Sequence, residues 1–320
     1  MRLKSRLLAA VALASATILP VTAHASRNWV LPSTTTLSGS NAWITVDAAS
    51  SDDLYFPDLR PLALTSIQVT AGDGAADQVQ NGSQGKLRST FDVQVTKPGT
   101  WKIASVSSMV MASWTENGEV KRFRGTGEDF AKQVPAGAAD LKTIRNLSRS
   151  ETFVTRDKPT SDALKPTGKG LELVPVTHPS DVVASEPATF KLLLDGKPAA
   201  GLEVEVMRGY DHWSAKPAAT LTVKTGPDGA FKVTMPQAGL WWISATYRTG
   251  ETGRGGPPGG EGGPRPQGAP GGAPAGGMPG MPGMSGPGGG EGRGQQGPAQ
   301  PLAGDGYSAS YTAVIEAQLP

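Results

Sequence analysis

Two histidines are the side chains best suited to binding a transition metal in this chain of 320 residues, which contains no cysteine. Imidazole is the commonest metal ligand, and the lack of cysteine excludes thiolate sites, thiol catalysis and haem attachment. His178 lies at a predicted strand end, and His212 lies between strands in the run Tyr210-Asp211-His212-Trp213. A loop histidine can also be solvated or hydrogen-bonded, so each residue is a candidate ligand with a structural alternative.

Carboxylates could do chemistry in two places. Asp47, Asp52, Asp53 and Asp58 form an acidic cluster around a Leu-Tyr-Phe segment, and paired carboxylates can hydrolyse glycosides when they are suitably separated. Surface acids on a strand-connecting loop are the simpler interpretation. Asp228, just before Gly229, could be a calcium ligand. One aspartate does not supply the several oxygen atoms that Ca²⁺ needs, so we predict a tight turn there.

Thioethers and paired tryptophans are weaker candidates. Met278, Met281 and Met284 recur every three residues, and three thioethers could bind Cu(I). Drift in a low-complexity segment explains this spacing more simply. Trp241 and Trp242 would form a sugar platform if both were exposed. Strand alternation, however, directs one member of such a pair toward the core.

Charge and motif content exclude several functions. The chain lacks a G-x-S-x-G elbow, an H-E-x-x-H pair, a P-loop and a G-x-G-x-x-G sequence after a strand, so we expect no enzyme. Without its first 25 residues, the chain has 27 basic and 28 acidic side chains. A nucleic-acid-binding protein usually has a basic excess, so we expect no nucleic-acid partner.

The first 25 residues have the order of an export signal. Basic residues in 1–6 precede an apolar run over 7–20, and small residues suited to signal peptidase follow. The apolar run is shorter than the ~20 residues that span a bilayer, so we expect a periplasmic protein without a transmembrane anchor after processing. Cleavage after Ala25 would leave Ser26 first. Cleavage after Ala23 would leave His24 first, with an amino group and imidazole that together chelate metal.

Short runs of alternating apolar and polar residues, bounded by Gly, Pro, Asn and Asp, predict β-strands throughout the rest of the chain. The expected strands are Ala42–Val46, Ser66–Val69, Phe91–Val95, Trp101–Val106, Leu171–Pro175, Ala188–Leu194, Leu202–Arg208, Ala219–Lys224, Ala230–Met235, Leu240–Arg248 and Tyr307–Leu319. We predict an all-β fold of two β-sandwich domains, immunoglobulin-like or transthyretin-like, over 26–160 and 171–320, with a linker at 161–170.

Local signals add turns and one helix. Pro98-Gly99 predicts a turn, because proline presets φ and glycine accepts a positive φ. Asn117-Gly118 predicts a hairpin turn that joins a strand through Trp114 to one through Val120 and Phe123. Thr126, followed by two acids and later by Pro135, predicts a capped short helix.

A Gly- and Pro-rich tract over 251–303 interrupts the second predicted domain. Residues 251–300 include 21 Gly and 10 Pro and no aromatic side chain. Such a composition cannot bury a core, so we predict a disordered loop.

The chain resembles the domain-of-unknown-function family 4198 over nearly all of the mature sequence apart from the tract. The matching segments are Arg27–Ser33, Trp43–Ala49, Ala112–Gly118, Arg122–Thr126, Glu151–Thr155, Leu171–Pro179, Asp195–Pro198 and the Asp228-Gly229 turn.

This resemblance implies an exported accessory protein linked with periplasmic nickel or cobalt uptake, and a membrane metal-transport component as its partner. Many relatives carry a histidine where this chain has Ser26, and some carry another where this chain has Pro57-Asp58. We therefore expect binding or delivery of a divalent metal, Ni²⁺ or Co²⁺, through His178, His212 or a terminal His24. The alternative function is a non-enzymatic envelope scaffold or adaptor that binds a protein or glycan.

Overall fold

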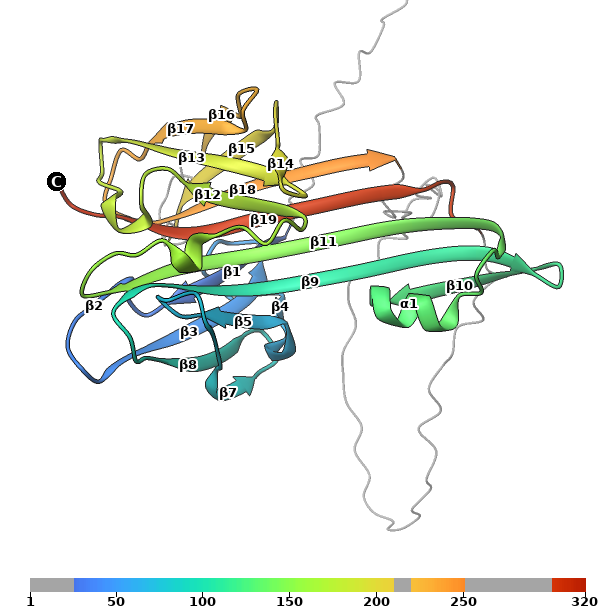
Figure 1. Ribbon diagram of the computed structural model, residues 1–320, viewed down its shortest axis with the longest axis horizontal. Helices are drawn as coiled ribbons and strands as arrows, with labels where there is room; N and C mark the ends of the chain where they lie inside the picture. Colours follow the sequence, from blue (N-terminus) through green and yellow to red (C-terminus); the bar gives the residue numbers. More distant parts are fainter. Residues whose placement is uncertain (1–25, 210–219, 251–300) are drawn as a thin grey trace, which may run out of the picture.

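A computed structural model describes residues 26–209, 220–250 and 301–320 (Figure 1). Within these ranges the chain is mostly β-strand, which confirms the all-β prediction. No helix in the described ranges has the length and apolar character needed to cross a membrane. Residues 1–25, which carry the predicted export signal, residues 210–219 and residues 251–300 of the Gly/Pro tract lie outside these ranges.

A ten-stranded sheet forms the middle layer of the molecule. Its main path is β16 (Thr220–Lys224), β15 (Glu203–Arg208), β18 (Gly239–Gly250), β19 (Gly306–Ala317), β11 (Ala139–Arg156), β9 (Gly99–Glu116), β5 (Ile67–Thr70) and β6 (Ala76–Asp77). β10 (Glu119–Gly125) adds to β9, and β2 (Thr36–Leu37) adds to β11. β11 and β19 pair in parallel. Strands from both predicted domain segments therefore share one sheet.

A five-stranded sheet covers one face of this layer. Its path is β1 (Arg27–Pro32), β3 (Ala42–Ser51), β8 (Ser89–Val95) and β7 (Gln80–Gln84), with β4 (Arg60–Pro61) added to β3. Alternate residues of β8, including Phe91 and Val93, are buried. They pack with Trp101 and Ile103 of β9 and Val154 of β11 in one core.

A four-stranded sheet covers the opposite face. It contains β12 (Leu171–Pro175), β13 (Pro187–Leu194), β14 (Lys197–Pro198) and β17 (Ala230–Thr234). Phe190 and Phe231 stack 5.6 Å apart in its core. The same core contains Trp241 of β18 and Tyr311 of β19. Because neighbouring residues of a strand point to opposite faces, the middle sheet supplies two different cores.

The predicted turns and helix are present where the sequence placed them. Asn117 and Gly118 have φ of 53° and 79° in the β9–β10 hairpin, and Gly229 has φ of 76°. α1 (Gly127–Gln133) is capped by Thr126, whose hydroxyl accepts a hydrogen bond from the Asp129 N–H. The short 3₁₀ helices are η1 (Leu64–Ser66), η2 (Asp162–Leu164) and η3 (Pro179–Asp181).

Four strands of the middle sheet, β9, β11, β19 and β18, run well past the smaller sheets (Figure 1). Near the tip of this extension, α1 packs on the β9–β10 hairpin through Phe130 and Phe123, whose rings lie 5.8 Å apart. Gly250 pairs with Gly306, so the tract connects the ends of two neighbouring strands. The predicted linker contains η2, with buried Ala163 and Leu164. The domain boundaries stay predictions.

Candidate functional site

His178 caps η3 and joins it to the middle sheet. Its Nδ1 accepts a hydrogen bond from the Ser180 N–H at 3.2 Å. This assigns the ring proton to Nε2, which donates to the Thr160 carbonyl at 3.1 Å and lies 3.1 Å from the Thr100 hydroxyl. A metal ion at either nitrogen would displace one of these hydrogen bonds.

The other predicted metal ligands are not brought together by the described residues. His24 and His212 lie outside the described ranges, as do Met278, Met281 and Met284. Within the described ranges, no three His, Cys, Asp or Glu side chains cluster closely enough to hold a metal ion. The metal-ligand assignment therefore stays a prediction.

The acidic cluster around residues 47–58 serves the local backbone. Asp58 accepts hydrogen bonds from the Asp52 and Asp53 N–H groups at 3.0 and 3.3 Å. Asp47 accepts from the Thr90 hydroxyl at 2.6 Å and pairs with Arg88 at 3.4 Å. These contacts give the carboxylates a structural role, as hydrogen-bond and ion-pair partners of the loop and of a neighbouring strand.

Two other candidates of the sequence have structural roles. Asp228 accepts a hydrogen bond from the Ala230 N–H and pairs with Lys191, and these contacts lower the pKa of its carboxyl group. The predicted turn is thus confirmed.

Trp241 and Trp242 are both buried, on opposite faces of β18, so the idea of an exposed sugar platform is wrong. Both of their faces are occupied because the middle sheet is covered on both sides there.

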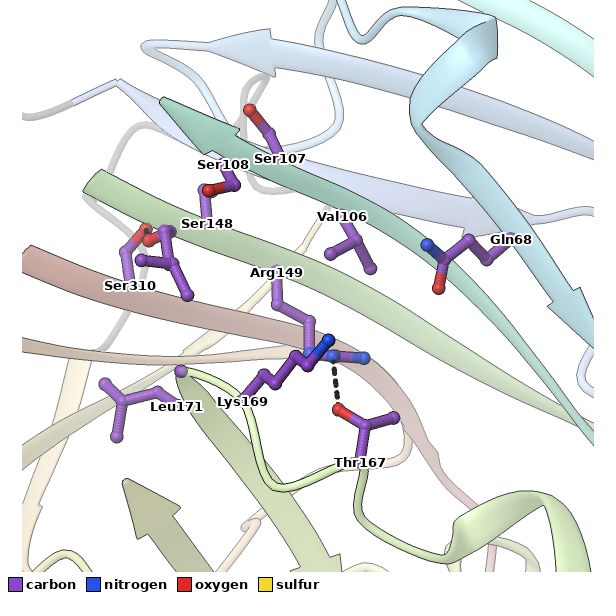
Figure 2. Close-up of a pocket in the computed structure, with 12 residues that line it drawn as sticks. Gln68, Val106, Ser107, Ser108, Ser148, Arg149, Thr167, Lys169, Leu171 and Ser310 are labelled. Carbon is purple, nitrogen blue, oxygen red and sulfur yellow. Dashed lines mark hydrogen bonds between the residues drawn. The ribbon is translucent and has the colours of Figure 1, made fainter. Parts of the chain in front are cut away.

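A cleft of about 480 Å³, the Arg149 cleft, lies between the middle sheet and the segment that leads into β12. Figure 2 shows the Arg149 side chain reaching Thr167, with Lys169 beside them. The guanidinium group donates to Thr167 and Glu151 at 3.0 Å each and lies 3.4 Å from Glu172. Its cation is therefore already neutralised by buried carboxylates.

Both carboxylates of this network have further donors. Glu151 accepts a hydrogen bond from the Tyr311 hydroxyl at 2.9 Å. Burial and the Glu151 charge raise the pKa of Tyr311 well above its ordinary value. Glu172 accepts from the backbone N–H groups of Thr167 and Gly168 at 2.8 and 2.7 Å. The hydrogen bonds and ion pairs of Arg149, Glu151 and Glu172 therefore connect the start of β12 to the middle sheet.

A second depression, of about 640 Å³, lies over the strand extension. We call it the arginine shelf and define it by Arg60, Arg124 and Arg248, the polar residues Asn28, Ser66, Ser105, Ser107, Asn146, Ser148, Thr246, Ser308 and Ser310, the thioethers Met109 and Met111, and the apolar residues Pro61, Leu62, Ala63 and Leu147. Among the residues that the structure describes, no carboxylate, imidazole or aromatic side chain lines it.

Strand register builds the floor of the arginine shelf. Ser107, Ser148, Ser310 and Thr246 are cross-strand neighbours on β9, β11, β19 and β18, and they form one row. Residues two positions along each strand form the next row, Met109, Asn146, Ser308 and Arg248. Cross-strand neighbours share a face, so this floor is made of hydroxyl, amide, thioether and guanidinium groups.

Elements outside the extension form the sides of the arginine shelf. Asn28 of β1 donates from its amide to Ser148 at 3.4 Å, and its buried Oδ1 has no hydrogen-bond partner within the described chain. Arg60 comes from β4. Arg124 comes from β10, and its Nε lies 3.2 Å from the Met109 sulfur.

The sequence did not point to the arginine shelf because its residues come from seven strands. One signal was available. The hydroxyl residues Ser148, Ser308 and Ser310 recur where a half-buried strand would carry apolar side chains. This pattern is typical of a strand whose face is open to solvent or to a ligand.

The structure is thus that of an all-β protein with two depressions along a long shared sheet. By sequence, residues 23–249 match the family described as "Domain of unknown function (DUF4198)". The chain belongs to this family, which confirms the resemblance noted from its motifs.

A DUF4785 family protein from Legionella pneumophila is similar among solved structures, with a TM-score of 0.21 and 8% sequence identity. The match covers 68% of this chain and 50% of that chain, so the alignment spans half of the solved structure. No curated protein matches the chain.

Proposed function

We propose that the mature protein is an exported, non-enzymatic binding protein of the periplasm, which acts as an envelope adaptor through the arginine shelf. The order of basic, apolar and small residues in 1–25 supports export. The arginine shelf carries the proposal, because it is a wide depression lined by groups that donate and accept hydrogen bonds.

The chemistry of the lining favours binding over turnover. Among the described lining residues, no imidazole or carboxylate can act as a general base for its serine hydroxyls. Guanidinium, hydroxyl and amide groups on rigid strands can instead hold a polar ligand in a fixed orientation. The arrangement therefore fits recognition of a polar partner.

Blocking the arginine shelf tests this function. Ser107 is exposed on β9, so Ser107→Trp fills the depression without disturbing a core. Ser83→Trp, at an exposed position on β7, adds the same bulk elsewhere. The mature protein would be screened by thermal shift against neutral and charged oligosaccharides and peptides, because a ligand that binds only the folded state raises the melting temperature.

We expect at least one ligand to bind saturably to the wild type and to Ser83→Trp, with at least tenfold weaker affinity for Ser107→Trp. Equal binding by all three proteins, or no ligand at all, would contradict a binding function for the arginine shelf.

A second candidate function is the binding or delivery of Ni²⁺ or Co²⁺ to a membrane transport component. One observation favours it. Arg27 pairs with Ser51, so the chain enters β1 beside the loop that carries Asp52 and Asp58. A mature terminus at His24 would begin three residues before Arg27. An amino group, imidazole and carboxylate together could bind a divalent ion.

Mass spectrometry and calorimetry test the metal function. Mass spectrometry should show a mature chain that starts at His24 instead of Ser26. Calorimetric titration with Ni²⁺ should show a saturable site that weakens as the pH falls below about 6, because protonated imidazole cannot bind metal. His24→Ala should abolish the site, and His178→Ala and His212→Ala test the other candidates. A start at Ser26 without any divalent-ion site would exclude this function.

A further inference from the structure

We propose that the ligand of the arginine shelf is an acidic saccharide, a sugar chain that carries carboxylate or phosphate groups. This inference rests on the proposed binding function and adds the chemical class of the ligand. Three observations carry it: a positive charge that no described residue balances, the rows of hydroxyl groups, and a described lining without aromatic side chains.

The described chain does not neutralise the positive charge of the arginine shelf. Arg60, Arg124 and Arg248 are exposed, and none of the described lining residues is acidic. Within the described chain, the Arg60 and Arg248 guanidinium groups form no ion pair or side-chain hydrogen bond, and Arg124 contacts only the neutral sulfur of Met109. Three like charges around one depression create a positive potential that attracts anions.

The Arg149 cleft provides the contrast within the same sheet. Its guanidinium group is held by Glu151 and Glu172, both buried, so an anion there would compete with two carboxylates. Within the part of the chain that the structure describes, the guanidinium groups of the arginine shelf instead keep paired N–H donors available. Guanidinium matches a carboxylate or phosphate through two parallel hydrogen bonds.

The floor supplies the hydrogen bonds that sugar hydroxyls need. Ser107, Ser308 and Thr246 form no side-chain hydrogen bond within the described chain, so each hydroxyl can donate and accept. Neighbouring strands place such groups about 4.8 Å apart, which provides a regular series of polar contacts for a linear chain. Met109 and Met111 add apolar surface for the C–H faces of sugar rings.

The composition of the described lining argues against a nucleic acid. Proteins that bind single strands stack the bases on aromatic rings, and the described part of the arginine shelf has no Phe, Tyr or Trp in its lining. The balance of 27 basic and 28 acidic residues after residue 25 also gives no general attraction to a polyanion. The positive charge is local, as expected for an oligomer with a few spaced acids.

Calorimetry with a matched pair of saccharides tests the proposal. Oligogalacturonate carries one carboxylate on each sugar, and its methyl ester is the same chain without charge. We expect saturable binding of the acid form, at least tenfold weaker binding of the ester, and a several-fold loss of affinity between 50 and 200 mM salt. Oligosaccharide phosphates and phosphatidylglycerol vesicles, used as separate arms, distinguish a sugar-borne anion from a lipid head group.

Charge-removing variants assign the binding to the arginine shelf. Arg248→Gln and Arg60→Gln should each weaken binding of the acid form about tenfold, since each removes a charge-assisted hydrogen bond. Arg145→Gln is the matched control, because Arg145 is exposed on β11 but pairs with Val110, on the opposite face. It should bind like the wild type.

The outcomes separate this inference from the function on which it rests. If the ester binds as tightly as the acid form and Ser107→Trp abolishes both, the binding function stands and the acidic ligand is wrong. If vesicles bind and the soluble saccharides do not, the sugar assignment is wrong. If Arg145→Gln weakens binding as much as Arg248→Gln, the arginine shelf is not the anion site. If Ser107→Trp affects no ligand, both proposals fail.

Discussion

Replacing Arg149 by methionine should destabilise the protein strongly, because it removes the cation from a buried charge network. The Arg149 side chain is 8% exposed, and those of Glu151 and Glu172 are each 3% exposed. Removing one partner of a buried ion pair leaves an uncompensated charge and costs about 3–5 kcal/mol. We expect the free energy of unfolding to fall by that amount, measured from guanidinium chloride denaturation followed by tryptophan fluorescence.

The two carboxylates should differ in how far they can compensate for this loss. Glu172 keeps donors from Thr167, Gly168 and Lys169 after the guanidinium is removed. Glu151 keeps only the Tyr311 hydroxyl, so it carries most of the uncompensated charge. Adding Glu151→Gln to Arg149→Met should therefore restore more stability than adding Glu172→Gln.

An exposed ion pair provides the control. Lys132 pairs with Glu128 at 2.6 Å on α1, and both side chains are more than half exposed. Lys132→Met should cost about 0.3–0.5 kcal/mol, as is usual for an exposed helix pair. A loss below about 1 kcal/mol in Arg149→Met, or better rescue by Glu172→Gln, would refute this account of the network.

Three further perturbations test other parts of the structure. Gly209→Ala should lower stability by about 1–3 kcal/mol in chemical denaturation, because a Cβ there would overlap the Tyr55 ring, whereas Gly127→Ala meets open space and should be nearly neutral. Burial and a hydrogen bond to a neighbouring carboxylate raise the pKa of Tyr307 to about 12. Folding thus favours the neutral form of Tyr307, so its contribution to the free energy of unfolding is complete below pH 10 and is lost between about pH 10 and 12. Absorbance titration should show this late ionisation. A tyrosine that titrates near 10 in its place would contradict the burial. Joining the ends of residues 251–300 by a short turn should change the stability by only about 1 kcal/mol of loop-closure free energy, and a large drop in melting temperature would show that the tract packs on the body.

The candidate site was only partly predictable from the sequence. His178 was selected because imidazole binds metals, but its contacts come from Thr100 and Thr160, which are distant in sequence. The arginine shelf was not predicted, since Arg60 and Arg248 are 188 positions apart. Their proximity follows from strand order in the middle sheet and from the packing of β4 beside it. No spacing rule for a motif describes such a site.

Strand extent also needed the tertiary structure. We expected one strand at Trp101–Val106 and another through Trp114, and β9 joins both in one strand that continues to Glu116. Most of β11 was not predicted, because it carries Lys142, Arg145 and Arg149 where a half-buried strand would have apolar residues. Both strands continue into the extension, where solvent can hydrate their polar side chains. Where a charged group on these strands is buried, a buried partner neutralises it.

The sequence alone determined the local structure: the all-β fold, the hairpin at Asn117-Gly118, the turn at Gly229 and the capped helix after Thr126. These features depend on φ preferences, capping and alternation, which act over a few residues. The tertiary structure alone decided the parallel pairing of β11 with β19 and the sheet that both halves share. Contacts such as Tyr311 to Glu151 join residues 160 positions apart, and global packing selects them, because no local pattern distinguishes one such partner from another.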